Sequence, residues 1–83
     1  MTVNKKFIVK NVGNFSMVID TSNPDSVIKL NSTAAEILDC IANGKTEDEI
    51  AKELMSEYDI TSDKAAADVE STVIRLKELG IVE

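Results

Sequence analysis

The sequence predicts an α+β domain in which a three-stranded antiparallel sheet is followed by three α-helices. Two observations lead to this fold class. Residues 5–30 are rich in Phe, Val and Ile, with Gly, Asn and Pro at intervals, as is typical of strands and turns. Residues 31–82 instead place apolar side chains at helical spacing. No low-complexity linker divides the 83 residues, so we expect a single domain over 1–83.

The first two strands are expected at residues 7–9 and 15–19, joined by a tight hairpin at Gly13-Asn14. The second strand alternates two sets of side chains, Phe15, Met17 and Ile19 against Ser16, Val18 and Asp20. A period of two indicates a strand with one buried face.

The third strand is expected at Ser26–Leu30. The Asn-Pro-Asp segment at residues 23–25 predicts the turn before it, because proline presets φ and Asx side chains bond nearby backbone. The simplest topology for three such strands is a meander.

Each of the three helices begins with a candidate capping residue. Asn31 or Thr33 can cap the first helix, and Thr33 stands three residues before a glutamate, as in a capping box. Thr46 opens a second capping box, and Thr61 or Ser62 starts the third helix.

Apolar stripes and glycines complete the helical pattern. The predicted inward residues are Ala34, Ile37, Leu38 and Ile41 in the first helix, Ile50, Leu54 and Met55 or Tyr58 in the second, and Ala66, Val69, Val73 and Leu76 in the third. Gly44 is expected to end the first helix. Gly80 is expected to end the third, with Ile81 folding back on its last turn.

The composition argues against several classes of function. Fifteen acidic residues against nine basic ones give a net charge of −6, which disfavours binding to nucleic acid or to an anionic membrane. Histidine, the commonest general base and metal ligand, is absent. No glycine-rich phosphate loop and no EF-hand loop occurs. We therefore expect no enzymatic activity, no cofactor and no metal.

The single cysteine and the absence of long apolar runs indicate a cytoplasmic setting without a membrane span. We expect Cys40 to be a small buried hydrophobe rather than a reactive thiol, because no cation stands three or four residues away. Residues 47–49 (Glu-Asp-Glu) are interpreted as a solvated helix start.

Asp25-Ser26-Val27 allows one alternative. Small acidic carrier proteins attach a phosphopantetheine arm to a serine in an Asp-Ser-Leu type motif at a helix start. Here Ser26 precedes a β-branched segment and begins a strand, so we do not favour this interpretation.

Three segments carry a family resemblance. Residues 30–38 (LNSTAAEIL) resemble the LN-x-T-A-A-x-I segment of the coenzyme PQQ synthesis protein D family. Residues 44–58 are similar to the family's G-x-T…I…L…Y helix, and residues 68–82 to its D-V…L…G-L-V ending. Each segment alone is weak, but the three in register are fairly specific, and the resemblance runs from about residue 5 to residue 83.

The resemblance implies a winged helix-turn-helix-like fold that acts as a RiPP recognition element. Such a domain binds the leader segment of a ribosomally made precursor peptide. It then presents that peptide to a maturation enzyme, such as a radical SAM protein or a leader peptidase. This chain would be a stand-alone, chaperone-like adaptor, either a monomer or a weak homodimer. Thr72 departs from the family pattern, which often has an aromatic or large apolar residue there.

The expected binding mode is the addition of the peptide to the open edge of the third strand, with the third helix as the other wall. The candidate peptide-binding residues are Ser26, Val27, Ile28, Lys29, Leu30, Asp68, Val69, Thr72, Val73, Arg75 and Leu76. Three alternatives remain open: plain core packing of the apolar helix residues, a solvated helix face for the charged residues, and a strand edge that is covered.

The alternative function is a winged-helix regulator that binds nucleic acid. The third helix carries three basic side chains against four acidic ones, which leaves one net negative charge. A recognition helix of that charge would be repelled by phosphates, so peptide recognition is favoured.

Overall fold

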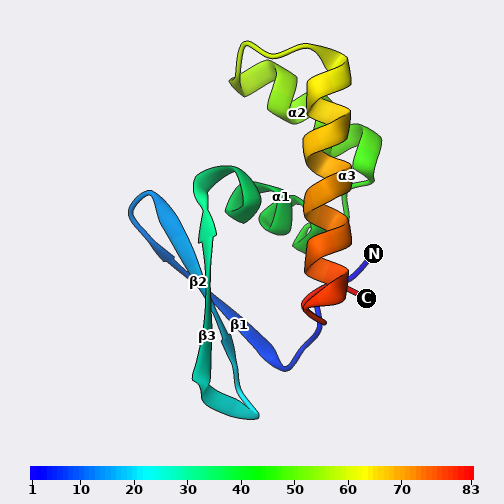
Figure 1. Cartoon of the computed structure of the whole chain (residues 1–83). Coiled ribbons are helices and arrows are strands. Elements are labelled where there is room, and N and C mark those ends of the chain that lie inside the picture. Colours follow the sequence, from blue (N-terminus) through cyan, green and yellow to red (C-terminus); the bar gives the residue numbers. More distant parts are fainter.

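The structure, a computed structural model, describes residues 1–83 as a small sheet followed by three helices (Figure 1). The elements are β1 (Phe7–Val12), β2 (Phe15–Asp20), β3 (Asn23–Asn31), α1 (Ser32–Ala42), α2 (Glu47–Glu57) and α3 (Ser62–Glu78). The predicted α+β order of three strands and then three helices is confirmed.

The sheet is an antiparallel meander in the order β1-β2-β3. Val12 pairs with Phe15 across the two-residue turn at Gly13-Asn14, so the predicted hairpin is confirmed. Gly13 has a φ of 62°, a conformation that glycine adopts without steric cost.

The start of β3 differs from the prediction. The strand begins at Asn23 rather than at Ser26, and the turn lies two residues earlier than expected. The Asp20 carboxylate closes this turn by accepting hydrogen bonds from the Ser22 N–H at 2.9 Å and its hydroxyl at 2.6 Å. The register between β2 and β3 shifts here, since Asp20 pairs with Asn23 and Ile19 with Val27. Pro24 is tolerated because it lies in this bulge of an edge strand and has no partner in β2.

The buried face of β2 carries its smaller side chains. Ser16 and Val18 are only 2% and 0% exposed, whereas the alternating set Phe15, Met17 and Ile19 is half-buried. The Ser16 hydroxyl donates to the Asn11 side chain at 2.6 Å, so its burial leaves no polar atom unpaired.

The helix starts follow the predicted capping residues. The Asn31 side chain accepts the Ala34 N–H, so Asn31 is the cap of α1, and Thr33 lies inside the helix without a capping box. Thr46 forms the predicted capping box of α2. Thr61 caps α3, which makes Ser62 its first helical residue.

The end of α3 folds back as predicted. The Gly80 N–H bonds to the Lys77 carbonyl at 3.0 Å, and the Ile81 N–H bonds to the Leu76 carbonyl at 2.9 Å. Gly80 has a φ of 77°, which this C-terminal motif requires. Ile81 is then fully buried.

The core is mostly aliphatic and includes most of the predicted inward residues. Those that are buried are Ile37, Leu38, Cys40 and Ile41 of α1, Ile50 and Leu54 of α2, and Val69, Val73 and Leu76 of α3, while Ala34 is half-buried. The burial of Cys40 was predicted and is confirmed.

Three predicted inward residues are not in the core. Ala66 is exposed, and Ala65, one position earlier on α3, is fully buried instead. Both alternatives at the end of α2 are wrong, since Met55 and Tyr58 remain exposed. The buried residues of α2 are Ile50 and Leu54.

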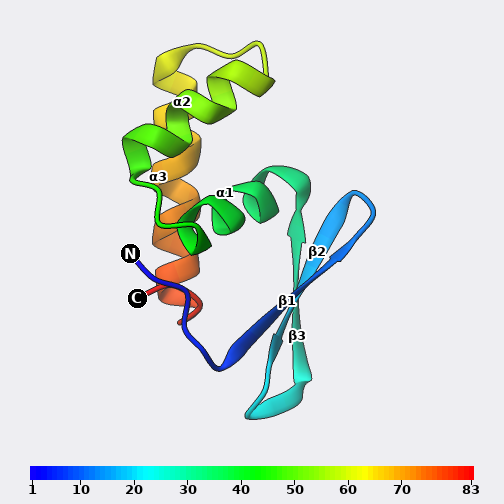
Figure 2. The same ribbon diagram turned by 180° about the vertical axis from the view of Figure 1, so that it is seen from behind.

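Helix α1 occupies the middle of the molecule, between the sheet and α3 (Figure 1). It contacts β2, β3, α2 and α3, whereas the backbone of α3 stays away from the strands. The two termini lie side by side near the end of α3, where Val3 forms an isolated bridge with Val82 (Figure 2). None of the helices combines the length and the apolar character that a membrane crossing requires.

Candidate functional site

A cleft of about 770 Å³ lies where the sheet, α1 and α3 meet. It is lined by Lys29, Leu30, Asn31, Thr33, Ala34, Asp68, Ser71, Thr72, Arg75 and Leu76. These residues come from the end of β3, the first turn of α1 and the middle of α3. The cleft exists because α1 holds α3 apart from the strands, so that α3 and β3 form two facing walls.

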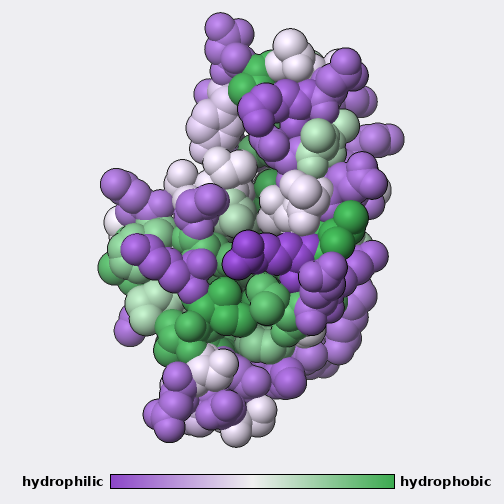
Figure 3. All heavy atoms as spheres, in the orientation of Figure 1, coloured by the Kyte–Doolittle hydropathy of each residue, from purple (hydrophilic) through white to green (hydrophobic).

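The lining of the cleft combines apolar and polar side chains. Leu30 and Leu76 are 5% and 1% exposed and belong to the core, and Ala34 is half-buried beside them. The remaining lining residues are polar or charged. Figure 3 shows hydrophobic side chains gathered over the sheet and beside the lower part of α3, below a more hydrophilic region. The cleft can therefore receive an amphipathic segment.

One wall of the cleft ends in a free strand edge. β3 pairs with β2 alone, so the main-chain groups on its other side have no partner strand. β1 is also an edge strand, but none of its residues lines the cleft. Main-chain donors and acceptors are thus available beside the cleft only on β3.

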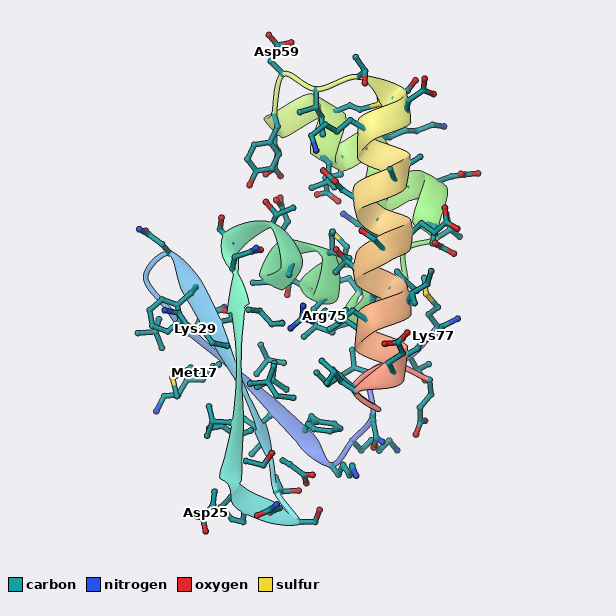
Figure 4. The ribbon with its side chains drawn as sticks, in the orientation of Figure 1. Met17, Asp25, Lys29, Asp59, Arg75 and Lys77 are labelled. Atoms are coloured by element: carbon teal, nitrogen blue, oxygen red, sulfur yellow. The ribbon has the colours of Figure 1, made fainter.

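The charged residues of the cleft differ in their surroundings. The Asp68 carboxylate lies 3.3 Å from the Lys64 ammonium, one turn away on the same helix. The Lys29 ammonium lies 4.3 Å from the centroid of the Phe15 ring, on the side of the sheet away from α3 (Figure 4). Arg75 reaches from α3 toward the sheet and takes part in none of the protein's three ion pairs (Figure 4).

The structure brings together six of the eleven candidate residues, namely Lys29, Leu30, Asp68, Thr72, Arg75 and Leu76. Ser26, Val27 and Ile28 lie on β3 but outside the lining of the cleft. Val69 and Val73 are buried and line a second hollow, of about 450 Å³, between α2 and α3. The residues therefore do not all face one site.

Four lining residues were missed, namely Asn31, Thr33, Ala34 and Ser71. The first three lie at the junction where β3 passes directly into α1. Capping rules identify this junction. The periodic patterns used to predict strands and helices do not, because each pattern covers only one of the two elements. Ser71 stands three residues after Asp68 and four before Arg75, so helical spacing alone could have placed it on the same face.

Two clusters of ionisable groups lie away from the cleft. Burial, and then the nearby Glu53 carboxylate, raise the pKa of the Cys40 thiol to about 11, and the thiol donates to Glu53 at 3.2 Å. Burial, and then the neighbouring Glu57, raise the pKa of Glu36 to about 7. Neither cluster pairs a nucleophile with a free base, and no group of three His, Cys, Asp or Glu side chains is placed to hold a metal ion.

Two solved structures resemble the whole chain. The first, TbiB1 in complex with the TbiA(beta) leader peptide, has a TM-score of 0.90 and 14% identity, and the match covers 100% of this chain and 95% of that one. At this identity the likeness shows the fold alone. The second, a lasso peptide synthetase B1 complexed with the leader peptide, has a TM-score of 0.87 and 26% identity, over 98% of this chain and 94% of that one.

A search of curated proteins found no match to the sequence. The sequence model for coenzyme PQQ synthesis protein D matches residues 21–82, from the turn before β3 to the end of the fold. This range contains all three segments on which the resemblance was based. It also contains both walls of the cleft, and the chain therefore belongs to the coenzyme PQQ synthesis protein D (PqqD) family.

Proposed function

We propose that this chain binds the leader segment of a ribosomally synthesised precursor peptide without catalysing a reaction itself. The observation that carries the proposal is the cleft of about 770 Å³ beside the free edge of β3. Support comes from the two similar structures, each of which contains a leader peptide. The peptide would lie between β3 and α3.

Strand addition explains how such a cleft holds an extended peptide. The peptide pairs with the free edge of β3, so its main chain gains hydrogen bonds that do not depend on its sequence. Side chains of an extended strand point alternately to opposite faces. One set would contact Leu30, Ala34 and Leu76, while the other set faces solvent.

The proposed role is that of an adaptor. Because no nucleophile–base pair lies in the cleft, the chemistry would belong to a partner, an enzyme that modifies the peptide or removes its leader. A bound peptide held by one segment leaves its remainder free to enter that enzyme. We place the protein in the cytoplasm, where a free cysteine such as Cys40 stays reduced.

The nucleic-acid alternative has less support from the site. The protein carries a net charge of −6, and its only arginine, although exposed, lines the cleft. Affinity for duplex DNA depends on clustered cations that displace counterions. Helix α3 offers no such cluster, since Asp68 already neutralises Lys64.

Titration of the isotopically labelled protein with the leader peptide of a precursor encoded beside its gene tests the proposal. We expect binding with a dissociation constant of roughly micromolar or below. Chemical-shift changes should concentrate on Lys29–Asn31 and on α3 around Thr72. Binding that leaves both regions unperturbed would rule out the proposed cleft.

The oligomeric state should be measured in the same titration. A second copy of the chain could pair with the same free edge of β3, which would block the peptide or share the site. Sedimentation velocity with and without peptide separates the two cases. We expect any homodimer formed through β3 to dissociate as the peptide binds.

A further inference from the structure

Arg75 is the only arginine of the chain, and it lines the cleft from the α3 side. Its side chain is directed toward the sheet (Figure 4) and forms no ion pair. Leu76, the next residue, is buried in the adjoining apolar part of the cleft. An unpaired cation therefore borders the apolar surface that would hold the peptide.

The other charges of the cleft do not neutralise this guanidinium. Asp68 stands seven residues earlier on α3, about 10 Å along the helix axis, and is paired with Lys64. Lys29 is turned to the far side of the sheet, where its ammonium lies over the Phe15 ring. Arg75 is thus the one charged group of the cleft that is both unpaired and directed into it.

This placement stands out against the charge of the whole protein. A net charge of −6 repels an acidic peptide at long range. Recognition of a carboxylate therefore requires a local cation, and the guanidinium is suited to it because its planar fork can donate two parallel hydrogen bonds to one carboxylate.

We propose that Arg75 determines the specificity of the cleft by selecting a peptide with an Asp or Glu side chain close to an apolar one. The apolar side chain contacts Leu30, Ala34 and Leu76, and the carboxylate pairs with the guanidinium. This inference rests on the proposed function, because it concerns the sequence preference of the same cleft. Main-chain pairing with β3 supplies sequence-independent affinity, and Arg75 supplies the selection.

A display library of random twelve-residue peptides tests the preference without knowledge of the natural ligand. The library is selected against the wild-type protein, against Arg75→Glu and against Lys77→Glu. Both variants change the net charge by the same amount, and both positions are exposed on α3. Lys77, however, lies outside the cleft (Figure 4). The comparison therefore separates local recognition from the general field of the protein.

We expect wild type and Lys77→Glu to enrich Asp or Glu at one fixed distance from an apolar residue, and Arg75→Glu to lose that enrichment. A selected acidic peptide should bind Arg75→Glu about tenfold more weakly than wild type. Replacing its acidic residue by Lys should recover affinity for Arg75→Glu alone.

Two outcomes overturn the inference in different ways. Selected peptides that perturb Lys29–Asn31 and α3 but show no acidic preference, or keep it in Arg75→Glu, would leave the peptide-binding function intact and remove the role of Arg75. Failure to select any peptide that perturbs the cleft would overturn both the inference and the proposed function.

Discussion

The side-chain oxygen of Asn31 accepts a hydrogen bond from the Ala34 N–H at 2.9 Å, which fixes the point where β3 becomes α1. Asn31 is the last residue of β3 and the N-cap of α1, so no loop separates the two elements. Both residues line the cleft. This capping interaction therefore lies at the junction between one wall of the cleft and its base.

Replacing Asn31 by Ala should lower the free energy of unfolding by about 1 kcal/mol, since the first turn of α1 loses its side-chain acceptor. The midpoint of urea unfolding measures this loss, with the slope unchanged. Asn31→Asp keeps an acceptor and should retain most of the stability. Ser32→Ala, at the exposed neighbouring position, should have little effect, and an equal loss there would contradict the capping role.

The helices were predicted well because their ends are decided locally. A capping side chain such as Thr46 or a left-handed glycine such as Gly80 acts within one turn, so a short sequence window contains the full cause. The turn before β3 was placed too late in the chain for the opposite reason. Pro24 and its neighbours have turn composition, but they form a bulged part of β3 between Asn23, which pairs with Asp20, and Val27, which pairs with Ile19.

The choice of buried face also depends on packing that no sequence window contains. The larger side chains of β2 suggest a core face, yet α1 covers the side that carries Ser16 and Val18. Likewise Ala65 and Ala66 are the same residue type, and only the packing of α3 in the folded chain buries Ala65 and leaves Ala66 exposed. The lining of the cleft could not be predicted in full for the same reason. Its α1 residues become neighbours of α3 only in the folded chain.

Cys40 should react slowly with alkylating agents in the folded protein. Burial, followed by the Glu53 carboxylate, raises the pKa of its thiol from 9.0 to about 11, so the reactive thiolate at pH 8 is roughly a hundredfold rarer than in the unfolded chain. Rates of iodoacetamide labelling with and without urea measure the ratio. Glu53→Gln removes one of the two causes and should speed the reaction only in part. Equal rates in folded and unfolded protein would exclude the raised pKa.

The protein should lose stability as the pH rises from about 4.5 to about 7 through the titration of Glu36. Burial and the neighbouring Glu57 raise the pKa of this carboxyl from 4.5 to about 7 in the folded chain. The folded chain then binds more protons than the unfolded one over this interval, so the free energy of unfolding falls with pH. Urea unfolding between pH 4.5 and pH 8 records the trend.

Glu36→Gln isolates this contribution. The amide oxygen can still accept the bond that Tyr58 donates at 3.2 Å, but the charge is gone. We expect a gain of about 1 kcal/mol at pH 8 and almost none at pH 5, where the wild-type carboxyl is already protonated. Glu70→Gln, at an exposed position on α3, should not reproduce this pH dependence. A gain of equal size at both pH values would argue against a shifted Glu36.

Proline substitution along β3 tests whether its free edge binds the peptide. Neighbouring residues of an edge strand point their N–H groups to opposite sides, one toward the partner strand and the next away from it. Ile28→Pro should weaken peptide binding by removing a main-chain donor and a local strand conformation. Val27→Pro and Lys29→Pro remove the N–H groups on either side, which point in the opposite direction. The effects on binding and on folding should therefore alternate along the three positions. Thermal unfolding of each free variant measures the effect on the fold, and peptide titration of the folded variants measures the effect on the site. If all three variants fold and bind the peptide as tightly as wild type, the peptide does not add a strand to β3.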